Sequence, residues 1–178
     1  MKLLVHICCG PCALYPIKEL LNEKFDKITG FFYNPNIHPP SEYKRRRDAL
    51  SEAAPKTGFE IIIPEYRMEE YFRKVMLKEG SSERCGLCWE LRLSETADFA
   101  KDSGFDAFTT TLLISPYQDH EKIKRIGEKI AEEKGIQFYY QDFRPGFKDG
   151  QDQAKKENIY RQKYCGCVFS ELERAKIK

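Results

Sequence analysis

Seven cysteines carry most of the chemistry that this sequence can perform, and they fall into three clusters. The clusters are Cys8, Cys9 and Cys12; Cys85 and Cys88; and Cys165 and Cys167. An odd number of cysteines at such short spacings argues against a secreted disulfide framework and favours metal or redox chemistry. The chain has three histidines and none in a zinc-like pair, so we expect all-sulfur ligation of zinc or of an iron–sulfur centre.

The first cluster lies where a strand should turn into a helix. Residues 3–7 form a short apolar run that predicts a buried strand of a parallel sheet, and helical spacing begins soon after it. Cys8, Cys9 and Cys12 can converge in such a turn, and the helix N-terminus that follows favours thiolates. A single cysteine could equally be a small buried apolar residue. Three within five residues favour a metal or redox site.

Cys85 and Cys88 stand at the start of an expected helix that runs to about Ser103. This spacing puts both sulfur atoms on one side of the helix, one turn apart. It suits thioredoxin-like exchange or one half of a four-thiolate metal site, and the position in the middle of the chain disfavours exchange. A half-site needs two more thiolates, which Cys8 and Cys9 can supply.

Cys165 and Cys167 flank a glycine, so a disulfide between them would close a very small ring. Such a ring departs from relaxed disulfide geometry and should be readily reduced. One interpretation is therefore an electron relay. The alternatives, two further metal ligands or idle thiols, stay open at this point.

Strands and helices alternate along the chain and must position these cysteines. The expected strands are 3–7, 28–33, 60–63, 105–112 and 137–140, and the expected helices are 13–21, 41–54, 68–78, 85–103, 116–134, a helix from about 151, and 168 to the C-terminus. Ser115, Pro116 and Gln118 predict a capping box that starts the helix 116–134. The order predicts one α/β domain over residues 1–178, with a mostly parallel five-stranded sheet and helices on both faces. Ligands bind such sheets at the carboxyl edge.

Charge and hydropathy limit how this protein could bind nucleic acids or membranes. The net charge is only +2, so a nucleic-acid surface would have to be a local patch. The basic run 44–47 could contact phosphates, although a solvated helix face is the commoner explanation. No run approaches the length of a membrane span and the start lacks a signal-peptide pattern, so we expect a cytoplasmic protein with no membrane partner.

Several polar residues follow the later strands at the same edge of the sheet. Tyr117, Gln118 and His120 follow the fourth strand, and Arg144 follows the fifth. Arg161 lies among tyrosines close to the last cysteine pair. Interleaved aromatic and basic residues suit an unpaired base and its phosphates. We expect His120 to donate a proton and the other four residues to contact a substrate.

Six motifs, in order along nearly the whole chain, resemble the QueH type of epoxyqueuosine reductase. They are residues 8–12 (CCGPC), 34–39 (NPNIHP), 84–88 (RCGLC), 109–118 (TTTLLISPYQ), 142–144 (DFR) and 160–167 (YRQKYCGC). The resemblance implies two-electron reductive deoxygenation of the epoxide of epoxyqueuosine at the tRNA wobble position, which gives queuosine. This is the last step of queuosine biosynthesis.

The resemblance also implies a [4Fe-4S] cluster, with additional iron close by. The implied cluster ligands are Cys8, Cys9, Cys85 and Cys88. The implied redox-active pair is Cys165 and Cys167. Cys12 would either bind the additional iron or only pack the turn.

Opening an epoxide to an alkene and water takes two electrons and two protons, and a cluster transfers one electron at a time. A dithiol would supply a second electron store. A Lewis-acidic iron could hold the departing oxygen, and an acid such as His120, Tyr117 or Asp119 would protonate it. Arg144, Arg161 and Lys163 are the basic residues expected to contact tRNA.

The implied fold is the Rossmann-like, HUP-type α/β fold of tRNA-thiolating enzymes. Cysteines replace the phosphate-binding loop of those enzymes, so ATP use is not expected. The implied partners are tRNA carrying epoxyqueuosine and an electron donor that the sequence does not identify, and the oligomeric state is equally open. Two other classes fit the cysteines: a thiol-dependent tRNA sulfur transferase and a non-catalytic, zinc-stabilised RNA-binding module.

Overall fold

The central sheet has five strands, all parallel, in the order β3-β2-β1-β4-β5. The structure is a computed structural model that describes residues 1–76, 78 and 83–176. The strands are β1 (Lys2–His6), β2 (Lys27–Phe31), β3 (Glu60–Ile62), β4 (Ala107–Thr110) and β5 (Gln137–Phe138). The predicted α/β class and five-stranded sheet are confirmed.

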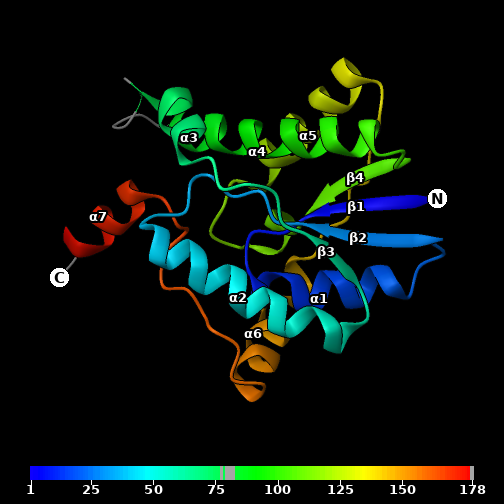
Figure 1. The fold of residues 1–178 in the computed structure, drawn as a ribbon, viewed down its shortest axis with the longest axis horizontal. Coiled ribbons are helices and arrows are strands. Elements are labelled where there is room, and N and C mark those ends of the chain that lie inside the picture. The colour runs from blue at the N-terminus through cyan, green and yellow to red at the C-terminus, as the bar shows by residue number, and fades with distance from the viewer. Residues whose placement is uncertain (77, 79–82, 177–178) are drawn as a thin grey trace.

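Helices cover both faces of the sheet (Figure 1). They are α1 (Gly10–Leu21), α2 (Pro40–Thr57), α3 (Met68–Val75), α4 (Glu83–Asp102), α5 (His120–Lys134), α6 (Phe147–Lys156) and α7 (Val168–Lys176), with 3-10 turns η1 (Thr111–Ile114) and η2 (Arg144–Gly146). In Figure 1, α3, α4 and α5 lie on one side of the sheet, and α1, α2 and α6 on the other. The C-terminal α7 lies at the end of the molecule opposite the N-terminus.

Strand β1 is the middle of the sheet and the centre of the core. Leu3, Leu4, Val5 and Ile7 have no solvent exposure, as an apolar run covered on both faces requires. Val5 pairs with Gly30 of β2 on one side and Thr109 of β4 on the other. The strand order reverses at β1, so a topological switch point lies beyond the carboxyl ends of β1 and β4. The first cysteine cluster follows β1 at this point.

Two predicted boundaries after β4 are wrong, for local reasons. The predicted strand 105–112 ends at Thr110, because the Thr110 hydroxyl accepts a hydrogen bond from the Leu112 amide at 3.1 Å and starts η1. The helix predicted from Pro116 begins at His120, because the Asp119 side chain accepts from the Lys122 amide at 3.0 Å and caps it. Residues 115–119 therefore form a projecting turn.

The remaining differences are smaller. Strand β5 is two residues long instead of 137–140, and α6 starts at Phe147 instead of near residue 151. Helix α2 runs past the predicted end and stops at Gly58, which has a left-handed φ of 78°. Parts of the predicted helix 68–78 and of the closing helix, at residues 77, 177 and 178, lie outside the described residues. Within the described residues, no helix combines the length and the apolar character that crossing a bilayer requires.

Candidate active site

The three cysteines of the first cluster, which we call the sulfur trio, converge at the switch point. The Sγ atoms of Cys8, Cys9 and Cys12 all lie within 4.8 Å of one another. The Sγ atoms of Cys8 and Cys9 are 3.8 Å apart. This matches the edge of a tetrahedral site, about 3.8 Å for metal–sulfur bonds of about 2.3 Å. The chain therefore presents three soft donors at the spacing that a thiolate-bound metal needs.

Thr111, which follows β4, and Gln162, near the C-terminus, hold the trio in place. The Cys8 amide donates to the Thr111 hydroxyl at 3.2 Å, and that hydroxyl donates to Cys8 Sγ at 3.4 Å. The Gln162 amide donates to Cys9 Sγ at 2.8 Å. Hydrogen bonds from Cys12 and Cys9 hold the pKa of Cys8 well below its ordinary value. Burial raises the pKa of Cys9, and the hydrogen bond to Cys8 raises that of Cys12, so the trio favours one thiolate, at Cys8.

Arg92, on α4, connects the trio with the second cysteine cluster. Its buried guanidinium contributes to the lowered pKa of Cys8. Burial raises the pKa of Cys88 to about 11, and Arg92 opposes this rise. Arg92 Nη2 donates to Asn34 Oδ1 at 2.6 Å, and Asn34 donates to the Ile7 carbonyl at 2.8 Å. A fixed positive charge thus lies near thiols of both clusters.

Two neighbouring cavities meet at this edge of the sheet. The larger cavity, of about 560 Å³, is lined by Cys8 and Cys12 of the trio and by Cys165. The smaller cavity, of about 190 Å³, is lined by the four cysteines outside the trio, which are Cys85, Cys88, Cys165 and Cys167. Arg92, Tyr117, Gln118 and Cys165 line both cavities. Six of the seven cysteines therefore border these two cavities, which share lining residues, and Cys9 is buried.

The last cysteine pair lies at the end of the segment between α6 and α7, residues 157–167, which we call the strap. The Sγ atoms of Cys165 and Cys167 are 3.6 Å apart, and both are free thiols. The Ser170 amide at the start of α7 donates to Cys167 Sγ at 3.3 Å. The hydrogen bond from Cys165, together with this amide, lowers the pKa of Cys167 to about 5. Cys167 is therefore the thiolate of the pair, and Cys165 is the thiol.

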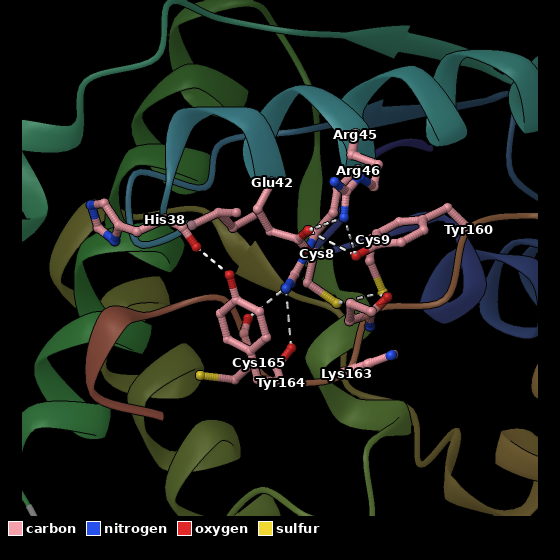
Figure 2. Close-up of polar contacts among 12 residues, drawn as sticks. Cys8, Cys9, His38, Glu42, Arg45, Arg46, Tyr160, Lys163, Tyr164 and Cys165 are labelled. Carbon is pink, nitrogen blue, oxygen red and sulfur yellow. Dashed lines mark hydrogen bonds and ion pairs between the residues drawn. The ribbon is translucent and has the colours of Figure 1, made fainter. Parts of the chain in front are cut away.

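The strap lies against the trio, opposite α2. Figure 2 shows Cys8 and Cys9 between α2, which carries Glu42 and Arg46, and the strap residues Tyr164 and Cys165. The bond from Gln162 to Cys9 fixes the strap against the trio.

The structure brings several predicted substrate residues to the cavities. Tyr117 and Gln118 line both cavities, and Arg161 and Lys163 of the strap line the larger one. The Tyr117 side chain is 85% exposed, and its ring packs edge-to-face against Phe147 at 5.7 Å. A large exposed ring at a cavity mouth is available for stacking on a base.

Two predicted residues are not among those that line the cavities. His120 is buried, and its Nε2 lies 3.1 Å from the Tyr140 hydroxyl. Its neighbour Asp119 lines the smaller cavity. The Arg144 guanidinium forms three hydrogen bonds to Asp142, and this pairing lowers the pKa of Asp142 to about 2.

Comparison with known proteins assigns this site to a family. A family model described as Epoxyqueuosine reductase QueH matches residues 3–173, which include all seven cysteines. The chain belongs to the QueH family of epoxyqueuosine reductases. As a QueH enzyme it is an oxidoreductase, and it converts epoxyqueuosine to queuosine in tRNA.

Two relatives align with this chain along nearly its whole length. The QueH enzyme of Dehalococcoides mccartyi is 40% identical over 97% of this chain and 94% of its own. The QueH enzyme of Thermotoga maritima is 41% identical over 96% of this chain and 91% of its own. A structure titled "predicted subunit of tRNA methyltransferase", from Methanocaldococcus jannaschii, aligns with a TM-score of 0.56 at 14% identity over 87% of this chain and 74% of that one. This last likeness concerns the fold alone.

Sequence reasoning on this QueH chain missed three residues that shape the site. Arg92 follows Cys88 by four residues on α4, so helical spacing alone could have placed it on the same face as the cysteines. Gln162 stands in a family motif, but no pattern indicated its contact with Cys9. Arg46 belongs to a basic run that suggested phosphate contacts or solvent, and it is buried.

Proposed function

We propose that the epoxide is reduced in the larger cavity, next to an iron–sulfur centre that Cys8 and Cys9 of the sulfur trio hold together with the second cysteine cluster. A [4Fe-4S] cluster needs four thiolates, and Cys8, Cys9, Cys85 and Cys88 are the proposed ligands. The convergence of the three trio sulfurs at the switch point is the observation that carries this proposal. Cys12 lies in the same group and lines the larger cavity, which favours binding of an additional iron over packing alone.

The residues present fit such a centre. The donors are thiols at metal-binding separations, and the Cys8 pKa is already low without a metal. The Arg92 Nε is buried and has no hydrogen-bond partner among the described residues, so its charge is free to balance an anionic centre. When bound, the cluster would supply electrons singly, and a neighbouring iron would polarise the epoxide oxygen.

The strap supplies two electrons and one proton in this proposal. Oxidation of the Cys165 thiol and the Cys167 thiolate to a disulfide releases two electrons and one proton. Reduction of the epoxide to an alkene and water consumes two electrons and two protons, so the second proton has to come from an acid in the site. The low pKa of Cys167 makes its thiolate available at neutral pH, and Cys165 lines both cavities. An external donor, which stays unidentified, must then reduce the disulfide.

The cavity mouth would hold the modified nucleoside of the tRNA. Tyr117 is proposed to stack on a base, and Gln118 offers an amide to hydrogen-bond it. Arg161 is proposed to contact phosphates beside the strap, and Arg144 lies outside the cavities as a more distant phosphate contact. His120 is the proposed acid. Its neighbour Asp119 lines the smaller cavity, which shares Tyr117 and Gln118 with the larger cavity where the epoxide would be reduced.

Metal analysis of anaerobically purified protein tests the proposed centre. We expect a brown protein with about four irons and a matching amount of acid-labile sulfide per chain, plus any additional iron. Replacing Cys85 and Cys88 by Ser should lower the iron and sulfide content together. Colourless protein with one zinc would contradict the proposal and support the RNA-binding module. Sulfur left in the tRNA with ATP consumption would support the sulfur transferase.

A further inference from the structure

Arg46 is a buried guanidinium in a run of four basic residues. The run lies on α2, and the neighbouring Arg45 and Arg47 are largely or partly exposed, while the Arg46 side chain is 2% exposed. Burying a charge is costly unless hydrogen bonds satisfy it. The reason for its burial lies in the strap.

Each nitrogen of the Arg46 guanidinium has a partner. Nη1 donates to the Cys165 carbonyl at 3.0 Å, and Nη2 donates to the Tyr164 carbonyl at 3.1 Å. Nε donates to Glu42 Oε1 at 2.8 Å (Figure 2). The two Nη atoms of the planar guanidinium, which we call the fork, thus donate to two successive carbonyls of the strap. The single ammonium of lysine cannot reproduce this geometry.

Helix α2 and the loop before it hold the strap at further points. The other Glu42 oxygen accepts a hydrogen bond from the Tyr160 hydroxyl at 2.7 Å. The Tyr164 hydroxyl donates to the His38 carbonyl, and the His38 amide donates to the Gly166 carbonyl at 2.7 Å. The backbone that carries Cys165 is therefore fixed on both sides by residues far away in sequence.

Gly166, between the two cysteines, lies against the same guanidinium. Its φ is +120°, which side chains rarely adopt. A Cβ atom there would lie 2.9 Å from the Ile37 side chain and 3.1 Å from Arg46 Nη1. The turn that brings the two sulfurs to 3.6 Å is thus shaped directly against Arg46.

We propose that Arg46 is a positioning residue for the Cys165–Cys167 pair and sets how readily that pair forms a disulfide. This inference rests on the proposed role of the pair as an electron store. The fork holds the carbonyls of Tyr164 and Cys165, so the two sulfurs need little reorganisation to bond. Without the fork the strap gains conformational freedom, and the entropy cost of closing the ring rises.

The test is the thiol–disulfide equilibrium of the pair in the holoenzyme, without tRNA. Protein is equilibrated anaerobically in mixtures of reduced and oxidised glutathione, the thiols are alkylated, and the Cys165–Cys167 peptide is quantified by mass spectrometry. One oxidised glutathione takes two electrons from the pair and, with one proton from the Cys165 thiol and one from water, gives two reduced glutathiones. Arg46→Lys keeps the charge and loses the fork, so we expect disulfide formation to become about tenfold less favourable.

Two further variants make the outcome decisive. Arg47→Lys is the matched control, because Arg47 pairs with its neighbour Asp48 and, among the described residues, with no residue of the strap. Its equilibrium should equal that of the wild type. Tyr160→Phe removes the hydroxyl that donates to Glu42. It should make disulfide formation about two- to fivefold less favourable. It carries the test alone if Arg46→Lys does not fold.

Each result has one meaning. A wild-type pair that forms no disulfide at any glutathione ratio overturns the electron-store role. A wild-type pair that forms a disulfide, with an unchanged equilibrium in Arg46→Lys and Tyr160→Phe, overturns the positioning role alone. A lower melting temperature with an unchanged equilibrium would assign Arg46 to fold stability and also overturn it.

Discussion

The sulfur trio and the strap pair are built in different ways. The trio follows β1, the fully buried centre of the sheet, and hydrogen bonds from Thr111 and Gln162 fix it. The strap pair lies in irregular chain before a terminal helix, with Cys165 exposed and Cys167 buried. The trio has the rigid surroundings of a permanent site, and the pair has the accessible surroundings of groups that change state.

The difference suggests a division of labour. A bound centre benefits from donors that a rigid scaffold holds at fixed separations. A dithiol that cycles with an external reductant must be reached from solvent and must contain a thiolate. The two regions meet at the larger cavity, which Cys8, Cys12 and Cys165 all line. Losing one region should therefore have a different signature from losing the other.

Replacing Cys8 by Ser should produce the largest effect. Removal of a residue that only supports a metal ligand already lowers metal affinity or activity by about 10- to 100-fold. Removal of a ligand should therefore lower turnover by more than about 100-fold. Iron content should fall with activity. Metal analysis and single-turnover assays check this, and a Cys8→Ser protein with full iron and full rate would break the comparison.

Replacing Cys167 by Ser should separate the two regions. Iron content should stay at the wild-type level, while steady-state turnover falls by about 100-fold because the thiolate is lost. The pH dependence of cysteine alkylation in the wild-type protein gives a second test. Since the Cys167 pKa is about 5, its alkylation rate should rise as pH increases through about 5 and level off above, while Cys165 should react only at much higher pH.

His120 belongs to neither cysteine region and tests the proton supply. General acids typically contribute about 100-fold or more, so His120→Ala should slow single turnover by about 100-fold with the iron content unchanged. An unchanged single-turnover rate would remove His120 from the mechanism and leave Tyr117 and Asp119 as candidates.

Tyr117 tests the substrate side of the shared cavity. Base stacking on an aromatic side chain is worth about 1–3 kcal/mol, so Tyr117→Ala should weaken tRNA binding by about 5- to 150-fold. Tyr117→Phe keeps the ring and should bind like the wild type. Equal affinity of all three proteins for tRNA would exclude stacking at this position.

Charge reversal at the basic residues should have the smallest effect. Arg161→Glu should weaken tRNA binding and reduce its salt slope by about 1 or slightly more, as loss of a phosphate contact predicts. Arg144→Glu should have a smaller effect, because Asp142 already pairs with Arg144. A full salt slope for Arg161→Glu would place the tRNA backbone elsewhere.

The sequence predicted the fold where local and global preferences agree. The apolar run before Cys8 has to be a buried parallel strand, and the turn after it has to lie at the sheet edge. The boundaries after β4 could not be predicted in this way. The β-branched run at Thr110 resembles a strand, but its hydroxyl bonds the backbone two residues ahead, and Asp119 competes with Ser115 as the helix cap.

The site was predictable in its cysteines and much less so in its charges. Cysteine spacing marks the trio directly. The burial of Arg92 and Arg46 depends on Asn34, Glu42 and carbonyls of the strap, which approach only in the folded chain. Nothing in a run of basic residues distinguishes the one that will be buried.

The most direct test of this division of labour counts electrons in one turnover. Reduced protein, freed from any external donor, is mixed anaerobically with tRNA carrying epoxyqueuosine, and queuosine and the Cys165–Cys167 disulfide are both quantified by mass spectrometry. The account predicts one new disulfide for each queuosine formed. Queuosine that accumulates while both cysteines remain thiols would contradict it.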